Sequence, residues 1–242
     1  MTPPGRGSTM RAATLLLATL LLPAAAIAGR PLSTEDASAL DDRACQLESW
    51  VDRTRGHATD FSFVPACAVL GIEWQAGAVR TREGGRSATT ATFVQGKHAL
   101  VSVDEGAWGI GVVAGLTRSP RREEKNGWGD PYLIVPVSFG LGEDKGTRAL
   151  LHLNVGTTRA RDERRNLTLW GVAVEKPVTE RLTMVAEAFG ENAAKPFLRA
   201  GGRYAVFEGF DVDLTWIKRS GGSRNERYWS AGLHWEVPSL LP

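Results

Sequence analysis

Ser230 and His234 are the residues of this chain whose types and spacing come closest to a catalytic pair. They lie four positions apart in an alternating stretch, so their side chains share one face. A histidine could then act as base toward a serine nucleophile, as in a lipid hydrolase, but no nearby acid orients His234. We therefore predict no catalytic residue and expect that the chain is not an enzyme, with a lipid hydrolase kept as the least favoured alternative.

Two other patterns could indicate a cofactor or a metal, and the sequence argues against both. Gly109 to Ala114 reads GIGVVA and matches the dinucleotide fingerprint, but strict alternation puts this match inside a strand. The histidines are scattered, with no pair at metal-ligand spacing: His57, His98, His152 and His234. The sequence thus predicts neither a cofactor nor a metal site.

The first 28 residues are typical of a secretory signal peptide. Arg6 and Arg11 precede and flank the apolar run 12–22, and Ala26-Ile27-Ala28 provides a small-x-small cleavage signal. Removing residues 1–28 leaves 27 basic residues against 27 acidic ones. A neutral mature chain argues against nucleic acid as a partner.

The chain has two cysteines, Cys45 and Cys67. Export would place them in an oxidising compartment, where two thiols most often form one disulfide. A reactive thiol or a metal pair is the alternative, although neither cysteine has a second Cys or a His at ligand spacing. We predict a Cys45–Cys67 disulfide.

The strands that position these residues are predicted from apolar side chains that recur at every second position. In Trp108 to Leu116, apolar residues alternate with mostly small ones, and Trp229 to Val237 behaves similarly. The same period predicts twelve strands at 44–53, 60–67, 71–81, 88–98, 107–117, 131–140, 147–158, 165–175, 181–190, 196–206, 210–218 and 226–237. The even number favours an all-β fold, an up-and-down antiparallel barrel of about 12 strands of the outer-membrane type. A soluble periplasmic β-barrel or sandwich is the alternative, because it also alternates.

Connection lengths predict how such a barrel would sit in the membrane. Connections after odd strands tend to be long, charged or glycine-rich, such as REGGRS and RSPRREEKNGWGD, and most of those after even strands are shorter. Long outer loops and short periplasmic turns are the outer-membrane pattern, so both termini are expected in the periplasm. The predicted partners are outer-membrane lipid and lipopolysaccharide, and many of the eight tryptophans lie near strand ends, where an interfacial girdle would place them.

The non-apolar face of the strands carries charges that could pair inside a barrel. Folding back at residues 190–196 brings Glu187 opposite Arg199, and the next turn brings Arg203 opposite Asp213. The predicted lumen-facing residues are Glu48, Glu73, Arg148, His152, Asn154, Glu187, Arg199, Arg203, Asp211, Asp213 and His234.

The first hairpin gives an independent test of register. Pairing Cys45 with Cys67 places Phe61, Phe63 and Pro65 on the cysteine face, whereas a shift of one residue would set the phenylalanines opposite polar side chains. The disulfide is therefore expected to join the first two strands near the periplasmic rim.

The segments GRPLSTEDAS, CQLESW and VPAC, within residues 29–75, resemble a family of proteobacterial outer-membrane barrels described as related to the meta-pathway of phenol degradation. The resemblance implies an outer-membrane barrel with a role in solute passage and implies no catalytic residue. The sequence departs from common outer-membrane barrels in its C-terminal PSLLP, since they often end on an aromatic residue of the last strand.

Together these observations predict four regions: a signal peptide (1–28), an N-terminal periplasmic segment (29–43), one barrel domain (44–237) and a C-terminal tail (238–242). The leading hypothesis is a monomeric narrow passive channel for an unknown small solute, or a non-catalytic envelope protein. The alternative is a soluble periplasmic barrel that binds a small ligand.

Overall fold

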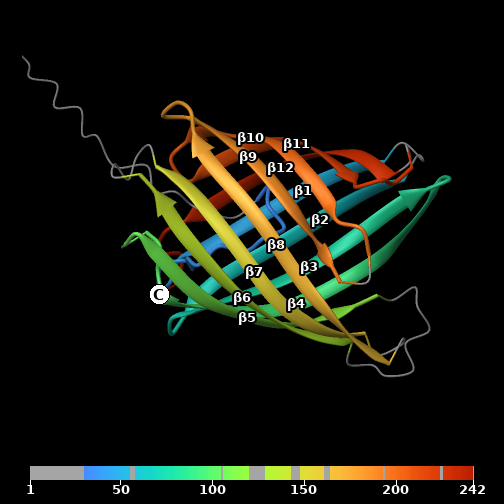
Figure 1. Ribbon diagram of the computed structural model, residues 1–242, viewed down its shortest axis with the longest axis horizontal. Helices are drawn as coiled ribbons and strands as arrows, with labels where there is room; N and C mark the ends of the chain where they lie inside the picture. The colour runs from blue at the N-terminus through green and yellow to red at the C-terminus, as the bar shows by residue number, and fades with distance from the viewer. Residues whose placement is uncertain are drawn as a thin grey trace, which may run out of the picture.

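The chain folds into a closed antiparallel barrel of twelve strands (Figure 1). The computed structural model describes residues 30–54, 58–104, 106–119, 129–142, 148–160, 164–192, 194–223 and 226–241. The predicted signal peptide, residues 1–28, lies outside the described residues. The strands are β1 (Cys45–Thr54), β2 (Thr59–Val69), β3 (Ile72–Glu83), β4 (Arg86–Val101), β5 (Trp108–Arg118), β6 (Asp130–Leu141), β7 (Ala149–Ala160), β8 (Arg165–Pro177), β9 (Leu182–Glu191), β10 (Phe197–Phe207), β11 (Phe210–Arg219) and β12 (Arg227–Val237).

Each strand pairs with its sequence neighbours, and β1 closes the barrel against β12. The up-and-down barrel with about twelve strands, predicted from alternation, is therefore confirmed. Closure leaves no strand edge with unpaired backbone groups, which a strand exposed to lipid could not tolerate.

The connections follow the expected asymmetry only in part, because those after β4 (102–107) and β6 (142–148) are longer than several after odd-numbered strands. The expected loop REGGRS is only a two-residue turn, because β3 extends to Glu83 and β4 begins at Arg86. Gly84 and Gly85 form this turn with φ of 57° and 79°. Two consecutive positive φ values suit glycine, which has no Cβ to clash, and the primed hairpin turns require them.

The registers of three hairpins agree with those predicted. Cys45 faces Cys67 across β1 and β2, and the two cysteines form a disulfide. Glu187 faces Arg199 across β9 and β10, and Arg203 faces Asp213 across β10 and β11.

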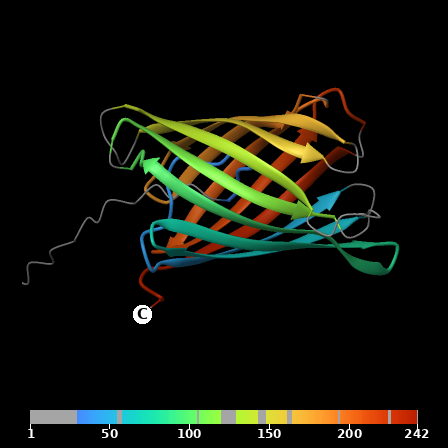
Figure 2. The ribbon, with the colours of Figure 1, turned by 90° about the horizontal axis from the view of Figure 1, so that it is seen from below.

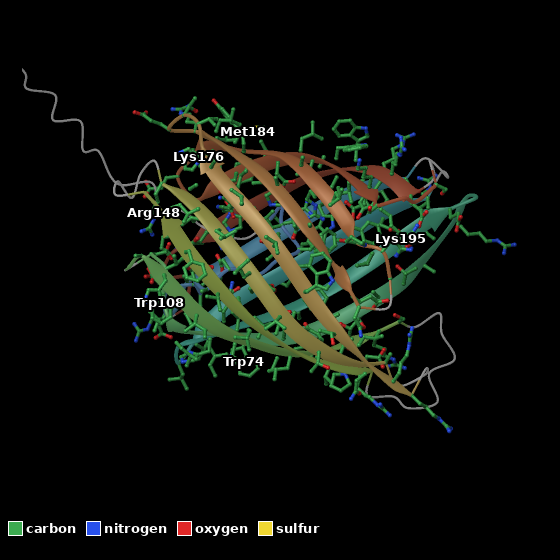
Figure 3. All side chains as sticks on the ribbon, viewed as in Figure 1. Trp74, Trp108, Arg148, Lys176, Met184 and Lys195 are labelled. Carbon is green, nitrogen blue, oxygen red and sulfur yellow. A yellow bond between two sulfur atoms is a disulfide. The ribbon has the colours of Figure 1, made fainter. Side chains whose placement is uncertain are left out.

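The outer face of the wall is apolar and the inner face is polar, as in a membrane barrel. On β12, Trp229 and Trp235 are exposed on the outside, whereas Ser230 and His234 are buried inside. On β2, Phe61 is exposed while its neighbour Ser62 is buried. Figure 3 shows side chains radiating outward from the wall, with Trp74 and Trp108 among them. A soluble barrel would instead turn its apolar residues inward.

Residues 30–40, which we call the inner segment, lie inside the barrel. Pro31, Thr34, Asp36 and Ala37 are all buried, and Figures 1 and 2 show the blue start of the described chain surrounded by the strands. The expectation of a separate periplasmic segment at 29–43 is wrong for these residues. Their polar backbone groups and charges find partners on the inner wall, which a position outside the barrel would not offer.

The GIGVVA stretch lies within β5, as its alternation predicted. A Cβ on Gly109 would lie 2.5 Å from the backbone nitrogen of Val103 and 2.6 Å from the carbonyl oxygen of Val101. The adjacent chain therefore occupies the space inside the wall at Gly109. At Gly232 the group that occupies this space is the side chain of Arg30 from the inner segment.

Candidate functional site

The lumen of the barrel is the candidate site, and Arg30 anchors one end of the inner segment in it. Its guanidinium donates to Asp213 Oδ1 at 2.9 Å and to Ser230 Oγ at 2.9 Å, and it lies 4.4 Å from the ring centroid of Trp50. Its backbone N–H donates to Glu48 Oε1 at 2.8 Å. A buried guanidinium needs such partners, since a buried charge without them is strongly destabilising.

Strands β9 and β10 hold the next residues. Glu187 Oε1 accepts the backbone N–H groups of Ser33, at 2.7 Å, and of Thr34. Arg199 pairs with Glu187 at 3.1 Å and donates to the carbonyl oxygen of Pro31. The predicted cross-strand pair Glu187–Arg199 thus exists, and it also binds the inner segment.

Arg203 belongs to a second charge network. It donates to the carbonyl oxygen of Arg30 at 3.2 Å and pairs with Glu175 at 2.7 Å. His152 Nε2 lies 3.6 Å from Glu175 Oε1, and His152 Nδ1 lies 2.8 Å from Ser138 Oγ. The contacts link four strands, β6, β7, β8 and β10, to the inner segment through side chains that are almost fully buried.

The acidic part of the inner segment faces Lys97 on β4. Lys97 Nζ forms ion pairs with Asp36 and, at 3.3 Å, with Glu35 Oε2. Asn154 on β7 accepts the backbone N–H of Glu35 at 2.8 Å and donates to its carbonyl oxygen at 2.7 Å. This two-way amide contact resembles a short piece of sheet pairing and fixes the segment near the middle of the lumen.

Two further contacts complete the attachment. The backbone N–H of Ala37 donates to Ser138 Oγ at 2.9 Å, and that of Leu40 donates to Glu73 Oε2 at 3.1 Å. Because β1, β3, β4, β6, β7, β9, β10, β11 and β12 all take part, the segment is bound around much of the wall. It therefore narrows the lumen.

Four predicted lumen residues contact the wall and its connections instead of the inner segment: Arg148, His152, Asp211 and His234. Arg148 donates to the carbonyl oxygens of Gly106, at 2.8 Å, and Val103, at 2.6 Å, both in the β4–β5 connection. Figure 3 shows Arg148 at the end opposite Lys195. His234 contacts Gln46 Oε1 at 2.9 Å through Nε2 and Asp211 Oδ2 at 3.4 Å through Nδ1.

The register of Arg203 and Asp213 is as predicted, but their charge partners differ. Asp213 pairs with Arg30, and Arg203 pairs with Glu175. The inner segment brings a third cation to this part of the lumen, which the pairing of neighbouring strands could not reveal. Lys97, Glu175 and Asp36 were also missed. Lys97 and Glu175 fall in the two predicted strands that alternate poorly, 88–98 and 165–175, so the period of two did not assign them a face.

The hydrolase alternative depends on contact between Ser230 and His234. Ser230 accepts from Arg30, and His234 contacts Gln46 and Asp211 instead. An acid does stand beside His234, contrary to the sequence-based expectation. The imidazole nevertheless has both nitrogens engaged away from Ser230, so the nucleophile and base are not arranged for catalysis.

A cavity of about 380 Å³ lies on the loop side of the inner segment. Ser33 and Thr34 belong to its lining, together with residues of β6 to β11 such as Asn154, Phe189 and Arg219. A smaller cavity of about 70 Å³ lies between the inner segment and strands β1, β3 and β4. The free space on the loop side of the inner segment is therefore larger than that between the segment and strands β1, β3 and β4.

Among the described residues, no group of three or more His, Cys, Asp or Glu side chains is placed to hold a metal ion. No helix in the described part of the chain is long and apolar enough to cross a membrane.

Comparisons with known proteins agree with the geometry. A family model described as "Uncharacterised conserved protein UCP029691" matches residues 16–233. The chain belongs to this family. The expected link to the meta-pathway of phenol degradation is not part of that description and stays a resemblance. No curated protein matches the sequence.

Solved structures show the same fold at low sequence identity. The chain is similar to the KdgM porin in complex with disordered oligogalacturonate, with 7% identity, a TM-score of 0.56, and coverage of 79% of this chain and 98% of that chain. It is also similar to the NanC porin, with 11% identity, a TM-score of 0.55, and coverage of 79% and 100%. The fold is therefore that of an outer-membrane porin barrel.

Proposed function

We propose that the protein is a passive channel for small solutes in the outer membrane and that its inner segment restricts the passage. The observation that carries the proposal is the closed barrel with an apolar exterior and a charged lumen filled by residues 30–40. Charged inner walls and lipid-facing apolar side chains are the properties of membrane barrels that conduct solutes.

The setting follows from the same features. Export by the signal peptide would deliver a monomer to the outer membrane with both termini in the periplasm, and the charged loops would meet lipopolysaccharide. The connections that follow even-numbered strands and the C-terminal end lie at one end of the barrel (Figure 1). The soluble alternative is disfavoured, because side chains such as Phe63, Val155 and Leu214 would then expose more than a third of their surface to water.

The inner segment is attached in a way that permits release. Its contacts are hydrogen bonds and ion pairs, and water entering the lumen could replace each of them. A typical hydrogen bond contributes only about 0.5–1.5 kcal/mol net, because water competes for both partners. Release of the segment would therefore proceed as water or a solute replaces these contacts one after another.

Planar lipid bilayers test the channel directly. The purified wild-type protein is expected to give small single-channel steps that alternate with closed periods. Heat-dependent gel mobility confirms that the barrel in each preparation is folded. A folded protein that gives no channels at high protein load would refute the channel function but not the barrel fold.

A reversible lock tests the role of the inner segment. A Cβ on Gly171 would lie 3.2 Å from Cβ of Thr34, close to the separation of about 3.5–4.5 Å in disulfides. The double variant Thr34→Cys, Gly171→Cys is therefore expected to tie the segment to β8. Channel openings should disappear on oxidation and return after reduction.

The wild type under the same reductant is the control, because it also loses the Cys45–Cys67 disulfide. Liposome-swelling assays with neutral sugars and with phenyl sulfate, a charged derivative of phenol, compare solute classes and include the one suggested by the family resemblance. Openings that persist in a fully cross-linked sample would exclude the inner segment as the restricting element.

A further inference from the structure

We propose that the 380 Å³ cavity is a binding site for a small organic anion with an apolar body. The inference rests on the proposed function and deepens it, since it names the class of solute that the channel would hold. The cavity is near the lower end of the usual range for small-molecule sites, about 300–1,000 Å³, so it suits a compact ligand.

The apolar part of the site contains two stacked rings. The ring centroids of Phe189 and Phe197 lie 5.6 Å apart with an interplanar angle of 22°. The guanidinium carbon of Arg199 lies 5.3 Å from the Phe189 centroid, and that of Arg219 lies 4.7 Å from the Phe197 centroid. The faces of both rings are thus covered by the other ring and by a guanidinium. A solute in the cavity would therefore meet the ring edges. Ring edges carry partial positive charge and favour an anion.

The cations of the lining favour the same charge. Lys195 and Arg219 both line the cavity, and Figure 3 shows Lys195 at the end opposite Arg148. The guanidinium of Arg219 pairs with Glu226 at 3.3 Å, yet among the described residues its buried Nε has no hydrogen-bond partner. Glu191 is the acid among the lining residues. A carboxylate in the cavity would give these cations an additional partner.

The floor of the cavity offers a second polar atom. Thr34 is only 5% exposed, and its hydroxyl, which lies beside the Glu187 carboxylate, has no hydrogen bond of good geometry to any described residue. It faces Gly171, where a Cβ would lie 2.4 Å from Oγ1. An unpaired buried hydroxyl is costly, because it has lost its bonds to water. A solute oxygen reaching the floor would satisfy it, and the contact would join the solute to the inner segment.

Isothermal titration in non-ionic detergent micelles measures binding without requiring conduction. The probes are benzoate, its neutral analogue benzamide, and acetate, which has the charge without the apolar body. Benzoate is expected to bind at least about tenfold more tightly than either analogue, since charge-assisted contacts and apolar burial each favour it.

Lys195→Met is the diagnostic variant, because Lys195 is exposed and its replacement leaves the strands unchanged. Benzoate affinity should fall roughly tenfold, whereas benzamide affinity should stay the same. Thr34→Val should weaken benzoate and benzamide together, since both carry an oxygen. Lys176→Met, an exposed lysine at the other end of β8, is the matched control and should leave all three affinities unchanged.

The outcomes separate this inference from the proposed function. Benzoate binding no tighter than acetate, or an equal loss of benzoate and benzamide in Lys195→Met, would overturn the anion site. Benzoate binding with the expected preferences by a folded protein that never conducts would support the site and overturn the channel. Conduction without any benzoate binding would support the channel and overturn the anion site.

Discussion

At the scale of single residues, the charges of the inner wall are explained by the segment that they hold. Glu187 accepts two backbone N–H groups of the segment, and Asp213 pairs with Arg30. Had the lumen been a plain water-filled channel, these groups could have remained solvated. Buried as they are, each must have its partner, so removing one partner should cost more than removing both.

The Arg30–Asp213 pair makes this testable. The two side chains are 5% and 2% exposed. Asp213→Asn leaves a buried guanidinium without its counter-ion and should destabilise the attachment of the segment by about 3–5 kcal/mol. The double variant Arg30→Met, Asp213→Asn should recover a large part of this loss. Protease cleavage of the inner segment in micelles measures its release, with the outer-face variant Ala186→Val as control. Equal effects of the single and double variants would refute the coupling.

At the scale of elements, the β1–β2 hairpin is fastened independently of the inner segment. The disulfide joins the first residue of β1 to a residue near the end of β2, on the same face as the exposed Phe61 and Phe63. It closes a loop with a sequence separation of 22 residues. The backbone contact of Leu241 with the Arg43 carbonyl oxygen, at 3.1 Å, ties the C-terminal tail to the same rim.

Replacing both cysteines by serine should therefore lower stability without changing function. In the loop-entropy account, losing a cross-link of this length costs roughly 3 kcal/mol. The midpoint of urea unfolding in lipid vesicles should fall, while single-channel conductance of the folded variant should equal that of the wild type. A folded double variant with altered conductance would revive a functional role for the thiols.

At the scale of the whole molecule, polarity is inverted relative to a soluble barrel. Apolar side chains form the exposed surface, and charged ones are buried around the inner segment. The inversion implies a hydrocarbon surrounding, where the cost of an outward charge should depend on its depth.

Two outward positions with similar exposure test that dependence. Leu214 lies in the middle of β11, and Val178 lies in the short β8–β9 connection. Leu214→Arg should destabilise folding into vesicles by about 2–4 kcal/mol, and Val178→Arg by about 0–1 kcal/mol, because only the first is near the midplane. A soluble barrel would tolerate both arginines equally. Equal and small effects on vesicle folding would argue against membrane insertion.

The order of residues along the chain is enough to predict the wall of the barrel. A strand fixes the face of each side chain by its period of two, so alternation, poor only in 88–98 and 165–175, predicted the strands. A single turn then fixes the register of a hairpin. These are local rules, which is why the order of residues alone is enough to pair Cys45 with Cys67 and Glu187 with Arg199.

The contents of the lumen depend on contacts that form only when the barrel closes. The inner segment has no periodic pattern, and its partners come from residues up to 200 positions away, as in the contact of Arg30 with Ser230. Closing the barrel brings those residues together around the lumen. The pairing of neighbouring strands alone does not predict which of them meet there. The charges that the sequence predicted to pair across the wall therefore also bind the chain's own N-terminal segment.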